Sequence, residues 1–355
     1  MARDLSHRSG DFRLNQGAVG RYFETATPEA LFVLSALSQY VGAAIAVSVF
    51  DEVEPQTVAW FRVIGAALAL LAVARGIHRG WTRRQLLGAA TFGVATALEF
   101  RLHPVKEIYG GPMFFAMKDA EAVLRYYRDF IATAPEQFGG FPAFQIAPPL
   151  PFIPVERHGE TFLAFIACWA GPVDEGEQIL KPLHDVAEVV AEHVGPMLYP
   201  ALNSAFDALV PAGLQHYWKA NFVRELTDEA IAAHLVHGPK VPAVNSTVHI
   251  YPINGACHRV AADATAFAYR DATFAPVIAG MWPDPAQNDA NIKWVRDYYA
   301  ATAPLSEEGG YINFMAGDDQ DRIKANYRGN YPRLVDVKRQ YDADNLFRVN
   351  QNIKP

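Results

Sequence analysis

The sequence predicts two unlike parts: an all-α, transmembrane-like hairpin within residues 25–98, and an α+β domain with an antiparallel sheet backed by helices from residue 99 onward. Three observations lead to this prediction. The first hundred residues contain two long apolar runs, and after them short β-rich runs alternate with helical patterns. The charge balance changes at the same place, because residues 1–98 hold 9 basic and 7 acidic residues, whereas the whole 355-residue chain holds 31 and 38.

Composition excludes several classes of protein. A chain that is 51% hydrophobic and 19% charged is too apolar to be disordered, and its net charge of −7 argues against a dedicated nucleic-acid binder. The two cysteines, Cys168 and Cys257, lie far apart in sequence, which excludes a disulfide scaffold and a CxxC motif. The eleven histidines form no HxH or HxxxH pattern, so we expect no metal site.

The two apolar runs predict that the first part of the chain binds a membrane. Residues 30–50 contain no charged residue, and residues 57–74 contain only Arg62. At ~1.5 Å per residue, the first run could cross a hydrocarbon core ~30 Å thick, so residues 30–74 are predicted to bind the lipid bilayer. The link between the runs is acidic and the outer flanks are basic, which places both ends of the hairpin in the cytoplasm. The alternative is a pair of buried helices in a soluble protein.

The second part reads as alternating strands and helices. Runs rich in β-branched and aromatic residues predict strands at 112–116, 143–147, 161–168, 246–253, 274–281 and 311–314. Apolar periodicity predicts helices at 118–133, 178–193, 288–302 and 320–338, the second one capped by Asp174. The proline-rich segment 147–154 is predicted to be a loop. Strands and helices in this mixed order favour an antiparallel sheet with helices on one face.

Residues 25–98 resemble the start of an EamA-type drug/metabolite transporter. The resemblance rests on ATPEALFVLSALSQYVGAAIAV, EPQTVAWFRVIGAALALLAVARG and RRQLLGAATFGV. It implies a helical hairpin plus a partial third helix. A transport path needs a whole bundle of helices to enclose it, so a transporter fragment is the most that this part predicts.

Residues 92–355 resemble FAD-linked oxidases of the berberine bridge enzyme type. The motifs, in order, are EFRLHPV at 99–105, HYWKANFVRELTDEAI at 216–231, RVAADATAFAYRDATF at 259–274, YINFMAGDD at 311–319 and YRGNYPRLVDVKRQYDADNLFRVNQNI at 327–353. The resemblance implies a substrate-binding α+β domain at 99–310 and a berberine-like C-terminal motif at 311–355. The remaining segments are a tail at 1–24 and the helical part at 25–98.

The resemblance also implies site residues. Tyr311 is the candidate catalytic base, because a tyrosine can take the proton of a substrate hydroxyl, and strand alternation puts Tyr311 and Asn313 on one face. The alternative is a Tyr/Asn pair of an ordinary sheet. His249, between apolar neighbours, reads as a sheet residue rather than a ligand. The implied substrate-binding residues are Tyr217, Lys219 and Tyr269, and the implied cofactor-binding residues are Tyr311, Asn313, Asn350 and Asn352.

The implied cofactor is FAD and the implied reaction is oxidation of a small alcohol, sugar or secondary metabolite. Residues 1–98 contain no Gly-rich phosphate-binding run, so we expect weak or absent FAD binding, with a separate FAD-binding domain as a partner. The chain then reads as a chimeric or truncated flavoprotein oxidoreductase. It is membrane-associated with its domain in the cytoplasm if the hairpin inserts, and otherwise cytoplasmic. The alternatives are a non-catalytic, membrane-tethered binding domain and a transporter fragment.

Overall fold

The computed structural model describes residues 92, 99–100, 105, 107–348 and 351–355. The chain divides into two units, and nearly all described residues belong to the second, which contains Phe100–Pro355. The predicted tail and hairpin, residues 1–24 and 30–74, lie outside the described residues, so the hairpin stays a prediction. Among the residues that are described, no helix has the length and apolar character needed to cross a bilayer.

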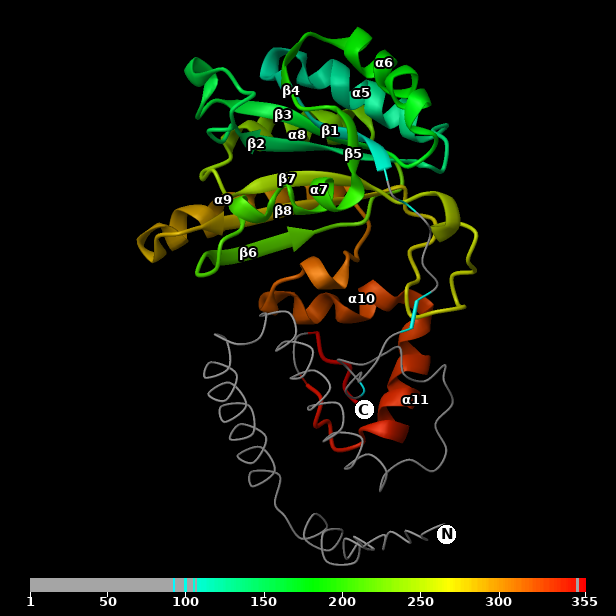
Figure 1. The fold of residues 1–355 in the computed structure, drawn as a ribbon. Helices are drawn as coiled ribbons and strands as arrows, with labels where there is room; N and C mark the ends of the chain where they lie inside the picture. The colour runs from blue at the N-terminus through cyan, green and yellow to red at the C-terminus, as the bar shows by residue number, and fades with distance from the viewer. Residues whose placement is uncertain (1–91, 93–98, 101–104, 106, 349–350) are drawn as a thin grey trace, which may run out of the picture. The chain divides into compact units, whose positions relative to one another are not determined.

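An eight-stranded antiparallel sheet is the centre of the fold (Figure 1). Its strand order is β4-β1-β3-β2-β7-β8-β6, and β5 also pairs with β1. This confirms the predicted antiparallel sheet. The strands are β1 Glu107–Ala116, β2 Phe138–Ile146, β3 Thr161–Trp169, β4 Val189–Glu192, β5 Gly195–Leu198, β6 Gln215–Ala220, β7 Thr247–Pro252 and β8 Phe274–Trp282.

Five of the six predicted strands are confirmed, as parts of β1, β2, β3, β7 and β8. The prediction of a strand at 311–314 was wrong, because Ile312–Phe314 forms a single 3₁₀ turn. The segment follows Gly309 and Gly310, and Gly310 packs its backbone against that of Ala220, where a β-carbon would come within 2.2 Å of the carbonyl oxygen. Sequence analysis missed β4, β5 and β6, which are short or polar.

Four helices bury their apolar sides on one face of the sheet. They are α5 Ala120–Ile131, α6 Gly176–Val186, α8 Asp228–His237 and α9 Asn288–Thr302. The helix predicted at 288–302 has those bounds, and the one predicted at 118–133 contains α5. The helix predicted at 178–193 ends early because the chain turns into β4. The predicted cap at Asp174 was wrong. Asp174 lies within a 3₁₀ turn at Val173–Glu175 that precedes α6, and the N-terminus of α6 has no side-chain cap.

The other face of the sheet is covered unevenly. Over β1 and β3, a cluster with Phe114 and Phe162 is covered by Leu202 of α7, Tyr199–Ser204, and by Ile153 of the proline-rich loop. Over β6 and β8, the buried apolar residues are aliphatic or contain sulfur: Ala220, Val277, Ala279 and Met281. The partly buried residues that pack on this second cluster are Leu214 and three aromatic residues, Trp218, Tyr251 and Phe314. An aromatic surface is therefore left on this half of the sheet.

The C-terminal region continues in two short helices, α10 Ile323–Tyr327 and α11 Tyr331–Tyr341. The prediction of one helix over 320–338 was wrong. Arg328 has a positive φ of 46°, which an α-helix does not accommodate, and a 3₁₀ turn at Arg328–Asn330 joins the two helices. This break lets the guanidinium of Arg328 lie 3.6 Å from the ring centroid of Tyr269.

Two glycines that flank β3 provide a matched test of the sheet. Gly110 of β1 and Gly139 of β2 both pair with Cys168, from opposite sides. A β-carbon on Gly110 would lie 2.2 Å from the carbonyl oxygen of Ala167, whereas one on Gly139 would come no closer than 3.9 Å to any neighbour. We therefore expect Gly110→Ala to lower the free energy of unfolding by about 1–3 kcal/mol or more, and Gly139→Ala to change it by about 0.5 kcal/mol or less. Urea denaturation measures both, and equal effects would contradict this sheet register.

Candidate functional site

Residues 310–322, here called the strap, cross the end of the sheet and carry the predicted Tyr311 and Asn313. The strap begins where the backbone of Phe222 donates to the carbonyl of Gly309 and the side chain of Asn326 accepts from the amide of Gly310. Phe314 then lies on the aromatic surface of the sheet. Its ring stacks on Tyr251 at 6.1 Å between centroids and packs against Trp218 at 5.8 Å.

A buried lysine fastens the strap to the edge strand β6. The ammonium of Lys219 donates to Asp318 Oδ1 and to Asp319 Oδ1, each at 2.8 Å. The side chains of Lys219 and Asp319 are only 8% and 4% exposed. Burial opposes the charge of Lys219, but the hydrogen bonds to the two aspartates outweigh it and raise its pKa. The lysine is therefore charged at neutral pH.

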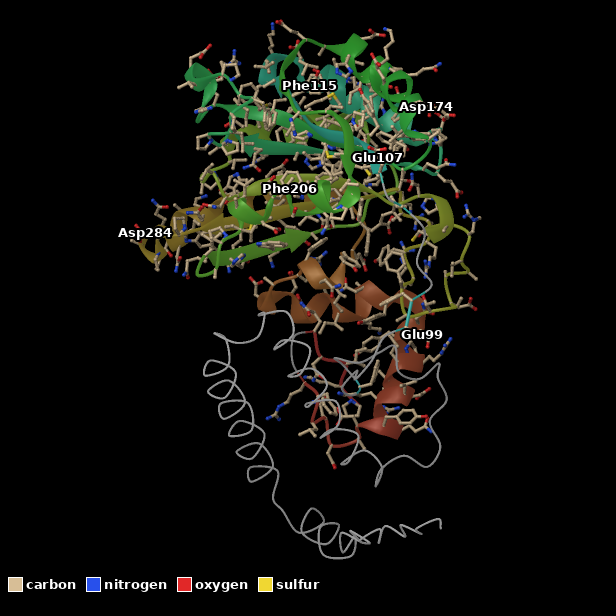
Figure 2. The ribbon with its side chains drawn as sticks, viewed as in Figure 1. Glu99, Glu107, Phe115, Asp174, Phe206 and Asp284 are labelled. Carbon is tan, nitrogen blue, oxygen red and sulfur yellow. The ribbon has the colours of Figure 1, made fainter. Side chains whose placement is uncertain are left out.

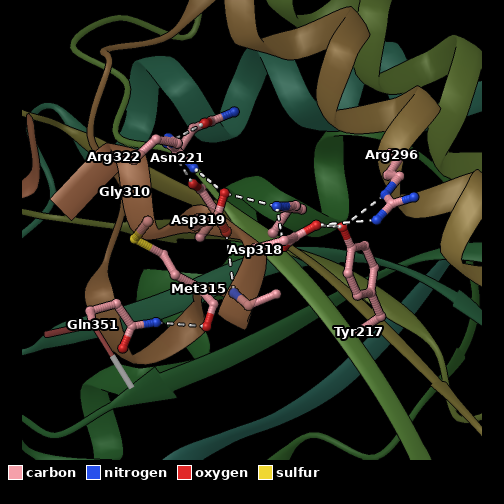
Figure 3. Close-up of polar contacts among 12 residues, drawn as sticks. Tyr217, Asn221, Arg296, Gly310, Met315, Asp318, Asp319, Arg322 and Gln351 are labelled. Carbon is pink, nitrogen blue, oxygen red and sulfur yellow. Dashed lines mark hydrogen bonds and ion pairs between the residues drawn. The ribbon is translucent and has the colours of Figure 1, made fainter. Parts of the chain in front are cut away.

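Further hydrogen bonds join Asp318 to β6 and α9 (Figure 3). Asp318 Oδ2 accepts from the hydroxyl of Tyr217 at 2.6 Å and from Arg296 at 3.2 Å, and Arg296 also donates to the Tyr217 hydroxyl at 3.0 Å. Partial burial opposes ionisation of Asp318, yet the bonds from Lys219 and Tyr217 bring its pKa to about 2. The strap is thus held by charged hydrogen bonds throughout the neutral pH range.

The predicted substrate residues Tyr217 and Lys219 face away from the aromatic surface. Successive residues of a strand point to opposite faces, so Trp218 lies on the aromatic side and its two neighbours on the side of α9. Lys219 Nζ lies 5.8 Å from the ring centroid of Tyr299 in α9. The geometry gives Tyr217 and Lys219 the role of holding the strap, and their role in substrate binding stays a prediction.

A histidine–tyrosine pair lies on the aromatic side of β7. His249 Nδ1 is 2.5 Å from the hydroxyl oxygen of Tyr251, and the ring of Phe141 packs on both, at 4.9 and 4.6 Å between centroids. Desolvation lowers the pKa of His249 to about 4 and raises that of Tyr251 to about 12. At neutral pH the imidazole is therefore uncharged, and its Nδ1 accepts a hydrogen bond from the Tyr251 hydroxyl. The predicted strand at 246–253 contained both residues, and its two-residue spacing could have shown that they share a face.

Tyr311 and Asn313 are brought together, although by a 3₁₀ turn rather than a strand. Asn313 Nδ2 donates to the Tyr311 hydroxyl at 3.1 Å, and the ring of Tyr311 lies 5.2 Å from that of Phe314. Tyr311 is 37% exposed. The hydrogen bond from Asn313 therefore fixes the position of the Tyr311 hydroxyl.

Tyr269 and Asn352 are not among the residues that line the two hollows described below. Tyr269 is 2% exposed, and its hydroxyl accepts from the amide of Gly309 at 2.9 Å and donates to the carbonyl of Ala325 at 3.0 Å. The geometry gives Tyr269 the role of bracing the start of the strap. Asn350 lies outside the described residues. Asn352 has a buried side-chain oxygen without a hydrogen-bond partner, and the adjacent Gln351 donates to the carbonyl of Met315 at 3.0 Å, which docks the end of the chain on the strap.

Two hollows flank Phe314, which lines both. The polar hollow, about 450 Å³, is lined by the predicted substrate residue Tyr217 and by His216, Trp218, Arg296, Asn313, Met315 and Asp318, among others. The apolar hollow, about 400 Å³, is lined mainly by Phe222, Tyr251, Ile253, Phe267, Ala275 and Tyr311. Tyr251 and the candidate base Tyr311 thus lie at the same hollow. Trp218 Nε1 is buried without a hydrogen-bond partner. Within the described ranges, no cluster of His, Cys, Asp or Glu could hold a metal ion.

Comparison with known proteins places this site in context. Residues 310–354 match the family model described as berberine and berberine like. An uncharacterised FAD-linked oxidoreductase of Bacillus subtilis, YgaK, is 25% identical over 76% of this chain and 57% of its own length. The aclacinomycin-N/aclacinomycin-A oxidase of Streptomyces galilaeus is 33% identical over 52% of this chain and 38% of its own. The chain therefore spans between about two-fifths and three-fifths of these relatives.

Solved structures show the same fold. Berberine bridge enzyme from Eschscholzia californica superposes with a TM-score of 0.60 over 75% of this chain and 59% of that structure, at 14% sequence identity. Aclacinomycin oxidoreductase superposes with a TM-score of 0.59 over 76% of this chain and 62% of that structure. Over about three-quarters of its length the chain is thus similar in sequence to an FAD-linked oxidoreductase and in fold to berberine bridge enzyme, and the cofactor that these similarities imply is FAD.

Proposed function

We propose that the aromatic surface under the strap is the substrate side of an FAD-dependent oxidoreductase acting on a hydroxyl-bearing small molecule. The observation that carries the proposal is the pair of phenols, Tyr251 and Tyr311, at one hollow, each with its own hydrogen-bond partner. Oxidation of a hydroxyl-bearing carbon needs a group that removes the hydroxyl proton. The FAD-linked relatives support the choice of cofactor.

The described residues fit the ring portion of a flavin. The surface offers the planar faces of Trp218, Tyr251 and Phe314, which suit stacking with a flat aromatic system. The buried, unpartnered Nε1 of Trp218 is a hydrogen-bond donor of the kind that a ring carbonyl could take up. We assign only the ring to these residues, and we propose that the diphosphate and adenosine are held by other residues or by a separate FAD-binding domain.

The chain's own residues supply orientation and proton transfer. Bound FAD would supply the acceptor for the hydride of the substrate carbon. Tyr311, in its phenolate form, accepts the hydroxyl proton and becomes a neutral phenol, and the Asn313 side chain holds the Tyr311 oxygen in place by donating its N–H. Tyr251 is the second candidate, because its hydroxyl lies at the same hollow and is oriented by its hydrogen bond with the imidazole of His249. Phe314 closes the surface above Tyr251 and excludes water from the reacting groups.

For location, we propose that residues 30–74 attach the chain to a membrane, with the α+β domain in the cytoplasm. The support is the uncharged run at 30–50 and the basic flanks of the hairpin.

Replacing Tyr311 by phenylalanine tests the proposed base. With excess FAD and a panel of primary and secondary alcohols under anaerobic conditions, we expect the chain to accelerate flavin bleaching. Tyr311→Phe should lower the rate by about 10²–10⁴-fold, the range for general-base catalysis. The control Tyr126→Phe, in α5 away from the site, should keep the wild-type rate. A wild-type rate for Tyr311→Phe would exclude Tyr311 as the base and leave Tyr251; no acceleration by the wild type would contradict the proposed function.

The neutral state of His249 predicts a pH dependence of stability. Folded His249 and His234 both have pKa values near 4, lowered by burial, whereas an unfolded histidine has a pKa of ~6.5. Between these values the unfolded chain binds more protons, so stability falls as the pH falls from ~6.5 towards 4. The slope of the free energy of unfolding against pH measures how many more protons the unfolded chain binds. In His249→Gln this number should fall by about one, as measured by urea denaturation across the pH range. The control His216→Gln, at an exposed position, should leave it unchanged; an unaltered slope in His249→Gln would show that its imidazole is not buried in the neutral form.

Cell fractionation tests the membrane prediction. We expect the full chain to stay with membranes through an alkaline carbonate wash, because two apolar helices insert far more stably than a peripheral protein binds. Replacing Ala44 and Ala67 together by aspartate, at the centres of the two runs, should release it, since each buried carboxylate costs about 2.5–3.5 kcal/mol on the insertion scale. Recovery of the wild type in the wash would contradict the hairpin and leave the catalytic proposal intact.

A further inference from the structure

We propose that the apolar hollow binds an apolar ring of the substrate, so that the substrate class is a hydroxyl-bearing compound built on an aromatic or alicyclic ring system rather than a free sugar. The reaction part of this inference rests on the proposed function, whereas the binding part does not. At about 400 Å³ the hollow lies within the range of small-molecule sites, about 300–1,000 Å³.

The walls of the apolar hollow are aromatic and are fixed by packing. Phe222 stacks on Tyr269 at 4.4 Å between centroids and meets Phe267 edge-on at 5.6 Å. The guanidinium of Arg270 covers the ring of Phe267 at 4.8 Å and donates to the carbonyls of Phe267 and Cys257. Because these rings are held before a ligand arrives, little conformational entropy is lost on binding.

The loop that forms the outer wall is tied to the C-terminal region. Asn330 Nδ2 donates to the carbonyls of Ala262 and Thr265 at 2.7 and 3.0 Å, and Arg333 donates to that of Asp263 at 3.0 Å. These bonds hold residues 254–272 beside the sheet. Hydrogen bonds within the fold therefore fix the wall of the hollow, which includes Cys257.

The two hollows differ in the chemical groups of a ligand that they can bind. In the apolar hollow the side chains of Ile253, Ala275 and Phe267 offer no hydrogen bonds, so the hydroxyls of a sugar ring placed there would lose water without replacement. The hydrogen-bonding side chains of this hollow include Asn254 and the phenols of Tyr251 and Tyr311, and the phenols meet the hydroxyl to be oxidised. Polar substituents are accommodated instead across Phe314, beside Arg296 and Asp318 of the polar hollow.

The two free cysteines provide a direct test of occupancy. Cys257 lines the apolar hollow, whereas Cys168 belongs to a different apolar cluster, on β3. The full-length chain is alkylated with iodoacetamide, and the rate at each cysteine is measured by peptide mass spectrometry, with 2-naphthol or glucose present. We expect 2-naphthol to slow alkylation of Cys257 at least about fivefold and to leave Cys168 unaffected. Glucose should change neither rate. Equal protection of both cysteines, or no protection by 2-naphthol, would overturn the proposal.

Variants locate the binding to this hollow. Phe267→Ala removes a wall, and we expect it to weaken 2-naphthol protection about tenfold, which corresponds to about 1.4 kcal/mol. The matched control is Phe152→Ala, whose ring packs on the cluster over β1 and β3. Thermal melting of both variants shows whether they fold. If Phe267→Ala does not fold, Ile253→Asp, which places a carboxylate in the hollow, takes its place in the same assay. Protection that survives in a folded Phe267→Ala or Ile253→Asp chain would contradict the assignment.

Flavin bleaching separates failure of this inference from failure of the proposed function. Protection of Cys257 without flavin bleaching by any alcohol would support the ring subsite and contradict the oxidoreductase proposal. Flavin bleaching by glucose, without protection of Cys257 by 2-naphthol, would support the oxidoreductase and overturn the ring subsite.

Discussion

The buried ion pair between Lys219 and the two aspartates of the strap is the interaction on which the candidate site depends. It joins the edge strand β6 to a segment about a hundred residues later in sequence, and it does so where Lys219 and Asp319 are almost entirely removed from water. Removing the lysine would leave the buried carboxylate of Asp319 with the longer contact to Arg322, at 3.4 Å, as its ion pair. Weakening a buried ion pair in this way costs more than an exposed salt bridge contributes. The position of Tyr311, Asn313 and Phe314 over the sheet follows from this attachment.

Strand alternation gives β6 two separate tasks. Tyr217 and Lys219 hold the strap from the side of α9, while Trp218 between them contributes to the aromatic surface on the opposite side. Four helices pack on one face of the sheet, and on the other face partly buried aromatic side chains pack over β6 and β8. Figure 2 shows the side chains on the sheet and on the helices around it. A rigid sheet with one half-covered face is a suitable scaffold for a site, because the packed face fixes the geometry of the open one.

Much of the sheet could be predicted from sequence, because short runs rich in β-branched and aromatic residues mark β1, β3, β7 and β8 directly. The local structure of the site was harder to predict. The turn at Ile312–Phe314 has a strand-like composition, but it follows Gly310, whose backbone lies close to that of Ala220. The role of Lys219 in substrate binding stays a prediction, and its bonds to the strap could not be predicted because they join segments about a hundred residues apart. The His249–Tyr251 pair was missed because its function depends on burial by Phe141, which comes from another strand.

In the proposed site, the strap, fastened by Lys219, completes a surface for the flavin ring. Lumiflavin has the ring but no phosphate or adenosine, so its binding can be followed by quenching of flavin fluorescence in the wild type and in Lys219→Met. We expect sub-millimolar binding to the wild type and at least about tenfold weaker binding to Lys219→Met, equivalent to about 1.4 kcal/mol. Arg125→Met, which loses only surface ion pairs, should bind lumiflavin as the wild type does. Equal lumiflavin affinity in all three proteins, or ADP binding without lumiflavin binding, would contradict the proposed site.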